Sequence, residues 1–141
     1  MLKILAILFF VLLLSTTTAF SDAQRTQETK LRLFQWRHTS VDEGYEIVFV
    51  GNLKTSSGEP IPKAEIIIKI DATCPRDGII AKGLTDSTGR YFIMTKALIW
   101  DEEDNMIKAH AEFLGNTENH SSISREQIIV IYPLHGNKCE E

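Results

Sequence analysis

The chain has 141 residues and a formal net charge of −4. This length suits one domain and leaves little room for two. An acidic balance argues against a nucleic-acid-binding face, which needs clustered Lys and Arg, and against attraction to anionic lipid. We therefore expect a single domain whose partners do not include nucleic acid.

The N-terminus has the pattern of a secretory signal peptide. A positive start at Lys3 precedes an apolar run of 11 residues, 4–14, and residues 15–23 are mostly small and polar. A membrane-spanning helix needs roughly 20 apolar residues, so the run is too short to act as an anchor. We expect a signal peptide over 1–23, cut after Ala23 or, in competition, after Ala19. The mature protein is then secreted or held at the cell surface, with no transmembrane segment.

Short apolar runs separated by turn residues make up the rest of the chain, and none has a sustained helical period. Period-two alternation is clearest at 106–115, where Ile107 and Phe113 fall on one face and Lys108 and Glu112 on the other. Turn signals recur about every ten residues, which is typical of an antiparallel sandwich. The predicted strands are 31–36, 45–53, 64–70, 79–85, 91–95, 106–115 and 127–132.

Two connections divide this pattern. The turn Asp86-Ser87-Thr88-Gly89 has an Asp to bond its own backbone and a Gly for positive φ, which predicts a hairpin between 79–85 and 91–95. Residues 56–62 carry two prolines and cannot lie in a central strand. We expect a flexible segment over 24–30, a sandwich domain over 31–133 and a polar tail over 134–141.

Five short segments follow the motif order of a known sandwich family. They are Gly51-Asn52-Leu53, Gly58 to Ile66, Gly83 to Tyr91, Ala109 to Gly115 and Ser122-Ile123-Ser124. The first three resemble the prealbumin-like, carboxypeptidase-regulatory-like sandwich. The last two look like immunoglobulin-like repeats of archaeal and bacterial secreted or surface proteins. Transthyretin-like secreted proteins share the size, the leader and the Thr-Asp turn.

The resemblance implies an all-β, seven-stranded antiparallel Greek-key sandwich of the immunoglobulin-like or prealbumin-like kind. It also implies that Tyr91 and Ile93 face the core while Phe92 and Met94 point outward. Two features depart from the family, because one copy stands alone here and the final strand lacks the Asn of a Lys–Asn isopeptide bond. We expect no such bond. Sandwiches of this kind serve as stalks, appendages and carriers, so the fold does not define the function.

Exposed apolar side chains on a strand face indicate a partner surface or a dimer interface. Phe92 and Met94 are therefore candidate binding residues, with Trp100 as a third. For Phe34, Trp36 and Trp100 the alternative is that their rings fill the core between the sheets. For Phe92 and Met94 the alternative is a shifted register.

Four consecutive acidic residues form the candidate metal site. Calcium prefers several carboxylate oxygens, so Asp101, Glu102, Glu103 and Asp104 are its candidate ligands. Consecutive side chains diverge and EF-hand spacing is absent, which favours a solvated charged loop instead. The four histidines show no metal-motif spacing. We expect no cofactor, with calcium as the alternative.

Cys74 and Cys139 are the two cysteines of the chain. In an exported protein such a pair favours one disulfide, and two free thiols are the alternative. Asn119-His120-Ser121 is an N-glycosylation sequon in a polar segment, so we expect Asn119 to be an exposed acceptor.

No serine lies in a Gly-x-Ser-x-Gly setting, and no Cys–His–Asn signature surrounds Cys74. We therefore predict a module that is not an enzyme and that binds a protein or cell-envelope partner, or supports adhesion, outside the cell. One alternative is a transthyretin-like carrier that holds a small apolar ligand between the subunits of a homo-oligomer. Another is an accessory domain of an extracellular enzyme system.

Overall fold

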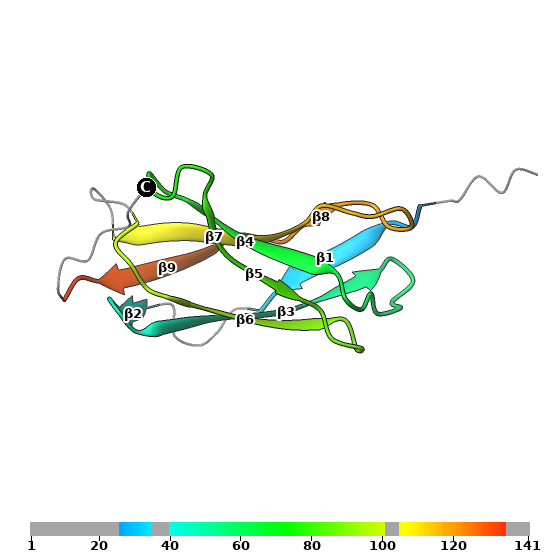
Figure 1. Cartoon of the computed structure of the whole chain (residues 1–141), viewed down its shortest axis with the longest axis horizontal. Helices are drawn as coiled ribbons and strands as arrows, with labels where there is room; N and C mark the ends of the chain where they lie inside the picture. The colour runs from blue at the N-terminus through cyan, green and yellow to red at the C-terminus, as the bar shows by residue number, and fades with distance from the viewer. Residues whose placement is uncertain (1–25, 35–39, 101–104, 135–141) are drawn as a thin grey trace, which may run out of the picture.

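A computed structural model describes residues 26–34, 40–100 and 105–134, which form two stacked β-sheets (Figure 1). The strands are β1 Thr29–Leu33, β2 Ser40–Asp42, β3 Glu46–Thr55, β4 Glu65–Asp71, β5 Ile79–Leu84, β6 Arg90–Lys96, β7 Met106–Phe113, β8 Ser122–Ile123 and β9 Gln127–Tyr132. The smaller sheet has the order β1-β3-β6. The larger has the order β2-β9-β7-β4-β5, with β8 paired to β7.

The structure confirms an all-β, two-sheet architecture with a strand in each predicted region. The count of seven strands is wrong, because β2 and β8 add two more. They have three and two residues, too few to show alternation in a sequence. The pairing is not wholly antiparallel either, since β2 runs parallel to β9. β1 begins at Thr29, so Thr29 and Lys30 of the segment expected to be flexible are paired strand residues.

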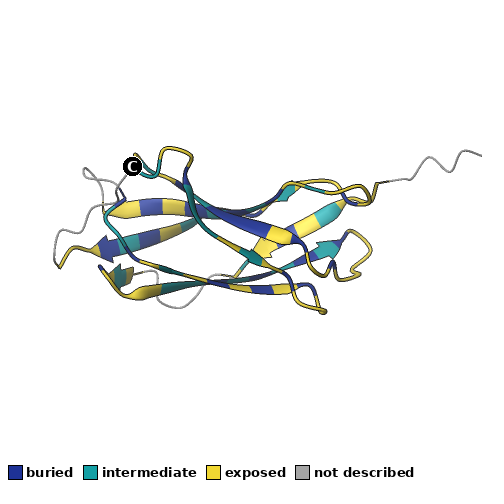
Figure 2. Cartoon of the chain, in the orientation of Figure 1, coloured by how far each residue is buried: buried dark blue, intermediate teal, exposed yellow. Residues whose placement is uncertain are grey.

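On β6 and β7 alternation places one face in the core and the other outside, as the blue and yellow blocks of Figure 2 show, whereas on β4 three consecutive residues, Ile66 to Ile68, are buried. On β7, Ile107 and Phe113 are buried as predicted. On β6, Tyr91 and Ile93 are buried while Phe92 and Met94 are exposed. The core lies between the inner faces of the two sheets and includes Leu31, Phe49, Leu53, Ile66, Ile68, Ile70, Tyr91, Ile93, Ile107, Ala109, Ala111, Phe113, Ile129 and Ile131.

The turn at Asp86–Gly89 forms, but the strands beside it do not make the predicted hairpin. Asp86 Oδ1 accepts hydrogen bonds from Thr88 N at 2.7 Å and Arg90 N at 3.0 Å. β5 pairs with β4 and β6 pairs with β3, so the turn carries the chain from one sheet to the other. Gly89 O already accepts from Leu53 N of β3 at 2.8 Å. The hydrogen bonds of Asp86 therefore determine the turn, whereas the pairing with β3 determines the sheet to which β6 belongs.

Gly51 of β3 lies where the side chain of Tyr91 crosses from β6 towards β1. The Tyr91 hydroxyl is buried, which raises its pKa, and donates a hydrogen bond to Arg32 O of β1 at 2.8 Å. A Cβ atom at Gly51 would overlap both the Tyr91 ring and Arg32 O. Glycine is required here by the close approach of these groups.

Thr85 fixes the proline-rich connector to the end of β5. Its buried hydroxyl donates to Ile61 O at 2.7 Å and accepts from Ala64 N at 2.9 Å. Its backbone N donates to Ala64 O at 3.0 Å, and its carbonyl accepts from Lys63 N at 2.9 Å. Thr85 thus provides hydrogen-bond partners for peptide groups of the connector that pair with neither sheet.

We expect Thr85→Val to lower the free energy of unfolding by about 1–3 kcal/mol, because it strands a buried donor and a buried acceptor. Thr26→Val is the matched control, since the bond from Thr26 Oγ1 to His120 Nε2 is exposed and water can replace it. Urea denaturation of both variants tests this. Equal midpoints for Thr85→Val and the parent would contradict the assigned role of this hydroxyl.

Candidate functional site

The outer face of the smaller sheet carries apolar side chains in adjacent rows. Val50 is directly opposite Phe92, and Val48 is opposite Met94. Phe34 continues the β1 alternation, and its N donates to Val50 O at 2.8 Å, which brings it into the first row. We call these five residues the apolar band. Phe92 is 62% exposed and Met94 is 53% exposed, although both are large apolar groups.

Cations lie next to the apolar band on the same face. Arg32, Asn52 and Arg90 form one row across the three strands, and Lys30 lies opposite Lys54 in the next. We call Lys30, Arg32, Lys54 and Arg90 the basic band. Its position on a chain of net charge −4 makes this face electrically distinct from the average surface.

A shallow depression of about 230 Å³ lies within the basic band, between β1 and β3. Its lining contains Lys30, Arg32 and Lys54 and no carboxylate. Lys30 Nζ donates to Ser56 O at 3.4 Å, which holds this ammonium at the rim. The depression can therefore accept an anionic group of a partner.

Part of this face was predicted from the sequence. The outward orientation of Phe92 and Met94 agrees with the register of β6. Trp100 does not belong to the face: it is 3% exposed and packs in the core, where its ring fills space between the sheets. Val48 and Val50 were not predicted to belong to this face, although they alternate in phase with Glu46 and Asn52. No local pattern in the sequence indicates which strand lies beside them.

Several other predictions fall wholly or partly outside the described residues. These are the signal peptide, the acidic residues Asp101 to Asp104, and Cys139. Cys74 lies within the described residues and is disulfide-bonded. Its pairing with Cys139 stays a prediction. Among the described residues, no group of three or more His, Cys, Asp or Glu could hold a metal ion, and no helix is long and apolar enough to cross a membrane.

Asn119 is not the exposed acceptor that the sequon predicts. The residue is 8% exposed, and its Nδ2 donates to Asn116 Oδ1 at 3.1 Å. Its carbonyl accepts from Asn116 N at 2.9 Å. Asn116 organises the turn that follows β7, because its Oδ1 also accepts from Glu118 N at 2.9 Å and Asn119 N at 2.8 Å. The predicted exposure of Asn119 is therefore wrong, and its glycosylation stays a prediction.

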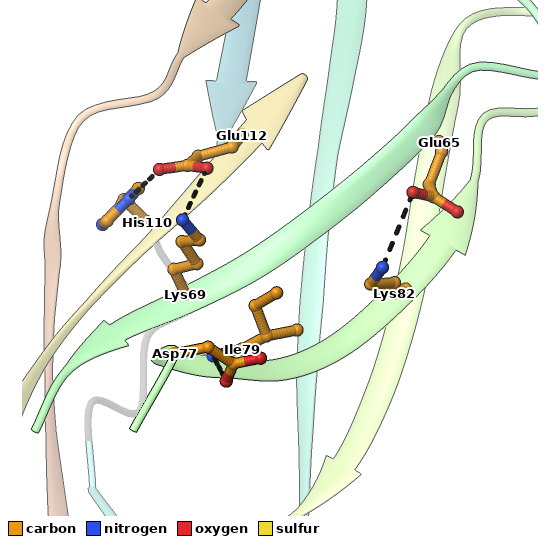
Figure 3. Close-up of polar contacts among 7 residues, drawn as sticks. All are labelled: Glu65, Lys69, Asp77, Ile79, Lys82, His110 and Glu112. Atoms are coloured by element: carbon orange, nitrogen blue, oxygen red, sulfur yellow. Dashed lines mark hydrogen bonds and ion pairs between the residues drawn. The ribbon is translucent and has the colours of Figure 1, made fainter. Parts of the chain in front are cut away.

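A polar cluster on the outer face of the larger sheet joins β4 and β7 (Figure 3). Glu112 Oε2 lies 3.2 Å from Lys69 Nζ, and Glu112 Oε1 lies 3.0 Å from His110 Nε2. The hydrogen bond with His110 holds the pKa of Glu112 below its ordinary value of 4.5, and Lys69 adds to this effect. Both carboxylate oxygens are engaged, which suits cross-strand stabilisation of the sheet.

No family model and no curated protein matches this sequence. Among solved structures, the chain is similar to the crystal structure of domains 4 and 5 of the S-layer protein SbsC, with a TM-score of 0.40 and 12% sequence identity. The alignment covers 74% of this chain and 51% of that chain, so the chain spans about half of that structure. An all-β architecture of this kind hosts many unrelated functions.

We expect Glu112→Gln to lower the free energy of unfolding at pH 7 by roughly 1 kcal/mol. The folded-state pKa of Glu112 lies below its unfolded value, so its contribution is full above about pH 4.5 and disappears as the pH falls through the folded-state pKa. Glu65→Gln is the matched control, because its ion pair with Lys82 is longer, at 3.8 Å, and more exposed.

Denaturation curves of the two variants and the parent at pH 7 and pH 3 test this expectation. The difference between Glu112→Gln and the parent should be smaller at pH 3 than at pH 7, while Glu65→Gln stays close to the parent throughout. A Glu112→Gln effect of the same size at both pH values would mean that packing, and not the charge, carries it.

Proposed function

We propose that the protein is a secreted or cell-surface module without catalytic activity, which binds a protein partner through the outer face of the smaller sheet. The observation that carries the proposal is the apolar band. Removing a side chain the size of Phe or Met from water contributes roughly 1.5–3 kcal/mol to the free energy of binding. A partner that covers Phe92 and Met94 therefore binds more tightly. The leader-like N-terminus supports the location outside the cell.

The basic band indicates the chemistry of the partner. A partner surface that matches this face has an apolar centre and carboxylates on the side that meets Arg32 and Arg90. The apolar contact supplies most of the affinity, because exposed charge pairs are screened by salt. The charges set the orientation in which the partner docks.

We further propose that the two sheets form an immunoglobulin-like or prealbumin-like Greek-key sandwich, which the order of the Gly, Pro and Thr-Asp motifs supports. Such a sandwich carries binding surfaces on its sheet faces. A second copy of this chain is the alternative occupant of the apolar band, as a transthyretin-like carrier would require.

We expect the double variant Phe92→Ser, Met94→Ser to bind the envelope of the producing cells at least about tenfold more weakly, because it removes two central apolar contacts. Leu84→Ser with Ile128→Ser is the matched control, since these residues are 64% and 53% exposed on the larger sheet. Co-sedimentation of the purified chain with the envelope fraction measures the affinity.

Light scattering on the same proteins separates the two occupants. A parent chain that is monomeric, with binding lost only in the Phe92–Met94 variant, supports a heterologous partner. A stable dimer that the same variant dissociates supports the carrier instead. Unchanged binding together with an unchanged oligomeric state would remove the apolar band as the functional surface.

A further inference from the structure

Among the described residues, β1 is an edge strand of the smaller sheet and pairs with β3 alone. Phe34 N donates to Val50 O and Ser56 N donates to Glu28 O, each at 2.8 Å, so the even residues from 28 to 34 bond towards β3. Hydrogen-bonding directions alternate along an antiparallel strand. The N–H and C=O groups of the odd residues 27, 29, 31 and 33 therefore point to the free edge.

The chain itself closes both ends of this edge. Gln27 N donates to Glu118 O at 2.7 Å, and Gln27 O accepts from His120 N at 2.9 Å. At the other end, Leu33 O accepts from Gln127 Nε2 at 3.3 Å. These contacts come from the loop after β7 and from the start of β9. Between them the Thr29 hydroxyl is hydrogen-bonded to His120 O at 2.9 Å and to Ser122 Oγ at 2.8 Å, so the open groups of this stretch are those of the backbone.

In this stretch, the peptide groups of Thr29 and Leu31 have no hydrogen-bond partner among the residues that the structure describes. A groove of about 600 Å³ runs along this stretch, with β1 as one wall and Ile123 and Arg125 as the other. Figure 1 shows β1 and β8 side by side at this end of the molecule. The volume falls in the range of ligand sites, about 300–1,000 Å³.

The side chains around the groove define what fits it. An added strand would lie about 4.8 Å from β1, with its side chains pointing alternately out and in. Those that point out would lie beside Lys30 and Arg32 on the outer face. Those that point in would meet the wall of the groove that Ile123 and Arg125 form, where Ile123 is 66% exposed. Acidic residues suit the first set and apolar residues the second.

A second copy of this chain does not suit the edge. A two-fold pairing of β1 with itself around Leu31 would place Lys30 opposite Arg32 of the second copy. Like charges directly opposite each other destabilise a strand pair, and edge cations are a recurrent defence against self-association. The same cations attract an acidic strand, so they select a heterologous partner.

We propose that the open edge of β1 is a second binding site, separate from the apolar band, which takes an extended acidic peptide with alternate apolar side chains by strand addition. The open peptide groups of Thr29 and Leu31 supply main-chain hydrogen bonds. The groove between β1 and β8 supplies the apolar contact, and Lys30 and Arg32 supply the charge selection.

The probe is a blocked synthetic octapeptide of alternating Glu and Val, titrated into the full secreted chain by calorimetry. Two further peptides carry N-methyl groups on one or the other set of alternate amides. In strand addition one set of N–H groups faces β1, so one methylated peptide binds at least about tenfold more weakly while the other binds like the parent peptide. Amide exchange at Leu31 slows when the peptide binds.

Protein variants locate the site. Ile123→Glu places a carboxylate in the groove and weakens binding at least about tenfold. Ile128→Glu, an equivalent change on the outer face of β9, leaves it unchanged. Phe92→Ser with Met94→Ser also leaves peptide binding unchanged, which separates this site from the apolar band. Equal weakening by both methylated peptides, equal effects of the two Ile→Glu changes, or no binding at millimolar peptide would overturn the proposal.

Discussion

The pairing of β3 with β6 is the constraint on which the rest of the structure depends. Their register aligns Gly51 with Tyr91, so the tyrosine can cross to Arg32 of β1 and join all three strands of the smaller sheet. The same register turns Phe92 and Met94 outward beside Val50 and Val48. It also removes β6 from β5, which is why the Asp86–Gly89 turn connects two sheets. The position of Tyr91, the crossing of the Asp86–Gly89 turn between the sheets and the exposed face with Phe92 and Met94 thus follow from the pairing of β3 with β6.

The sequence pattern predicts the long strands but not which strands pair with each other. Period-two alternation locates each long strand and its buried face, because burial on one side of a sheet is written directly into side-chain polarity. Pairing depends on contacts between segments far apart in the chain, which leave no local pattern. For that reason Phe92 and Met94 could be assigned outward, while their rows with Phe34, Val48 and Val50 could not. Trp100 shows the converse, because no alternation in the connection between β6 and β7 indicates whether an aromatic residue there is buried or exposed.

The two proposed sites use different parts of the same sheet. The apolar band offers side chains on a flat face, where affinity comes from burying area. The edge of β1 offers peptide groups, where affinity comes from hydrogen bonds that any sequence can make and selectivity from the side chains that flank them. Lys30 and Arg32 border both surfaces. A partner with an acidic, extended terminus and an apolar body could therefore contact both without rearrangement of the domain.

An open edge is hazardous for a β-sheet protein, because unpaired peptide groups invite aggregation. This chain reduces the hazard in two ways that leave the edge usable. Contacts from Gln127 and from the loop near Glu118 shorten the open stretch to the region of Thr29 and Leu31. Lys30 and Arg32 oppose a second copy. Protection against self-association and selection of an acidic partner are consequences of the same two cations.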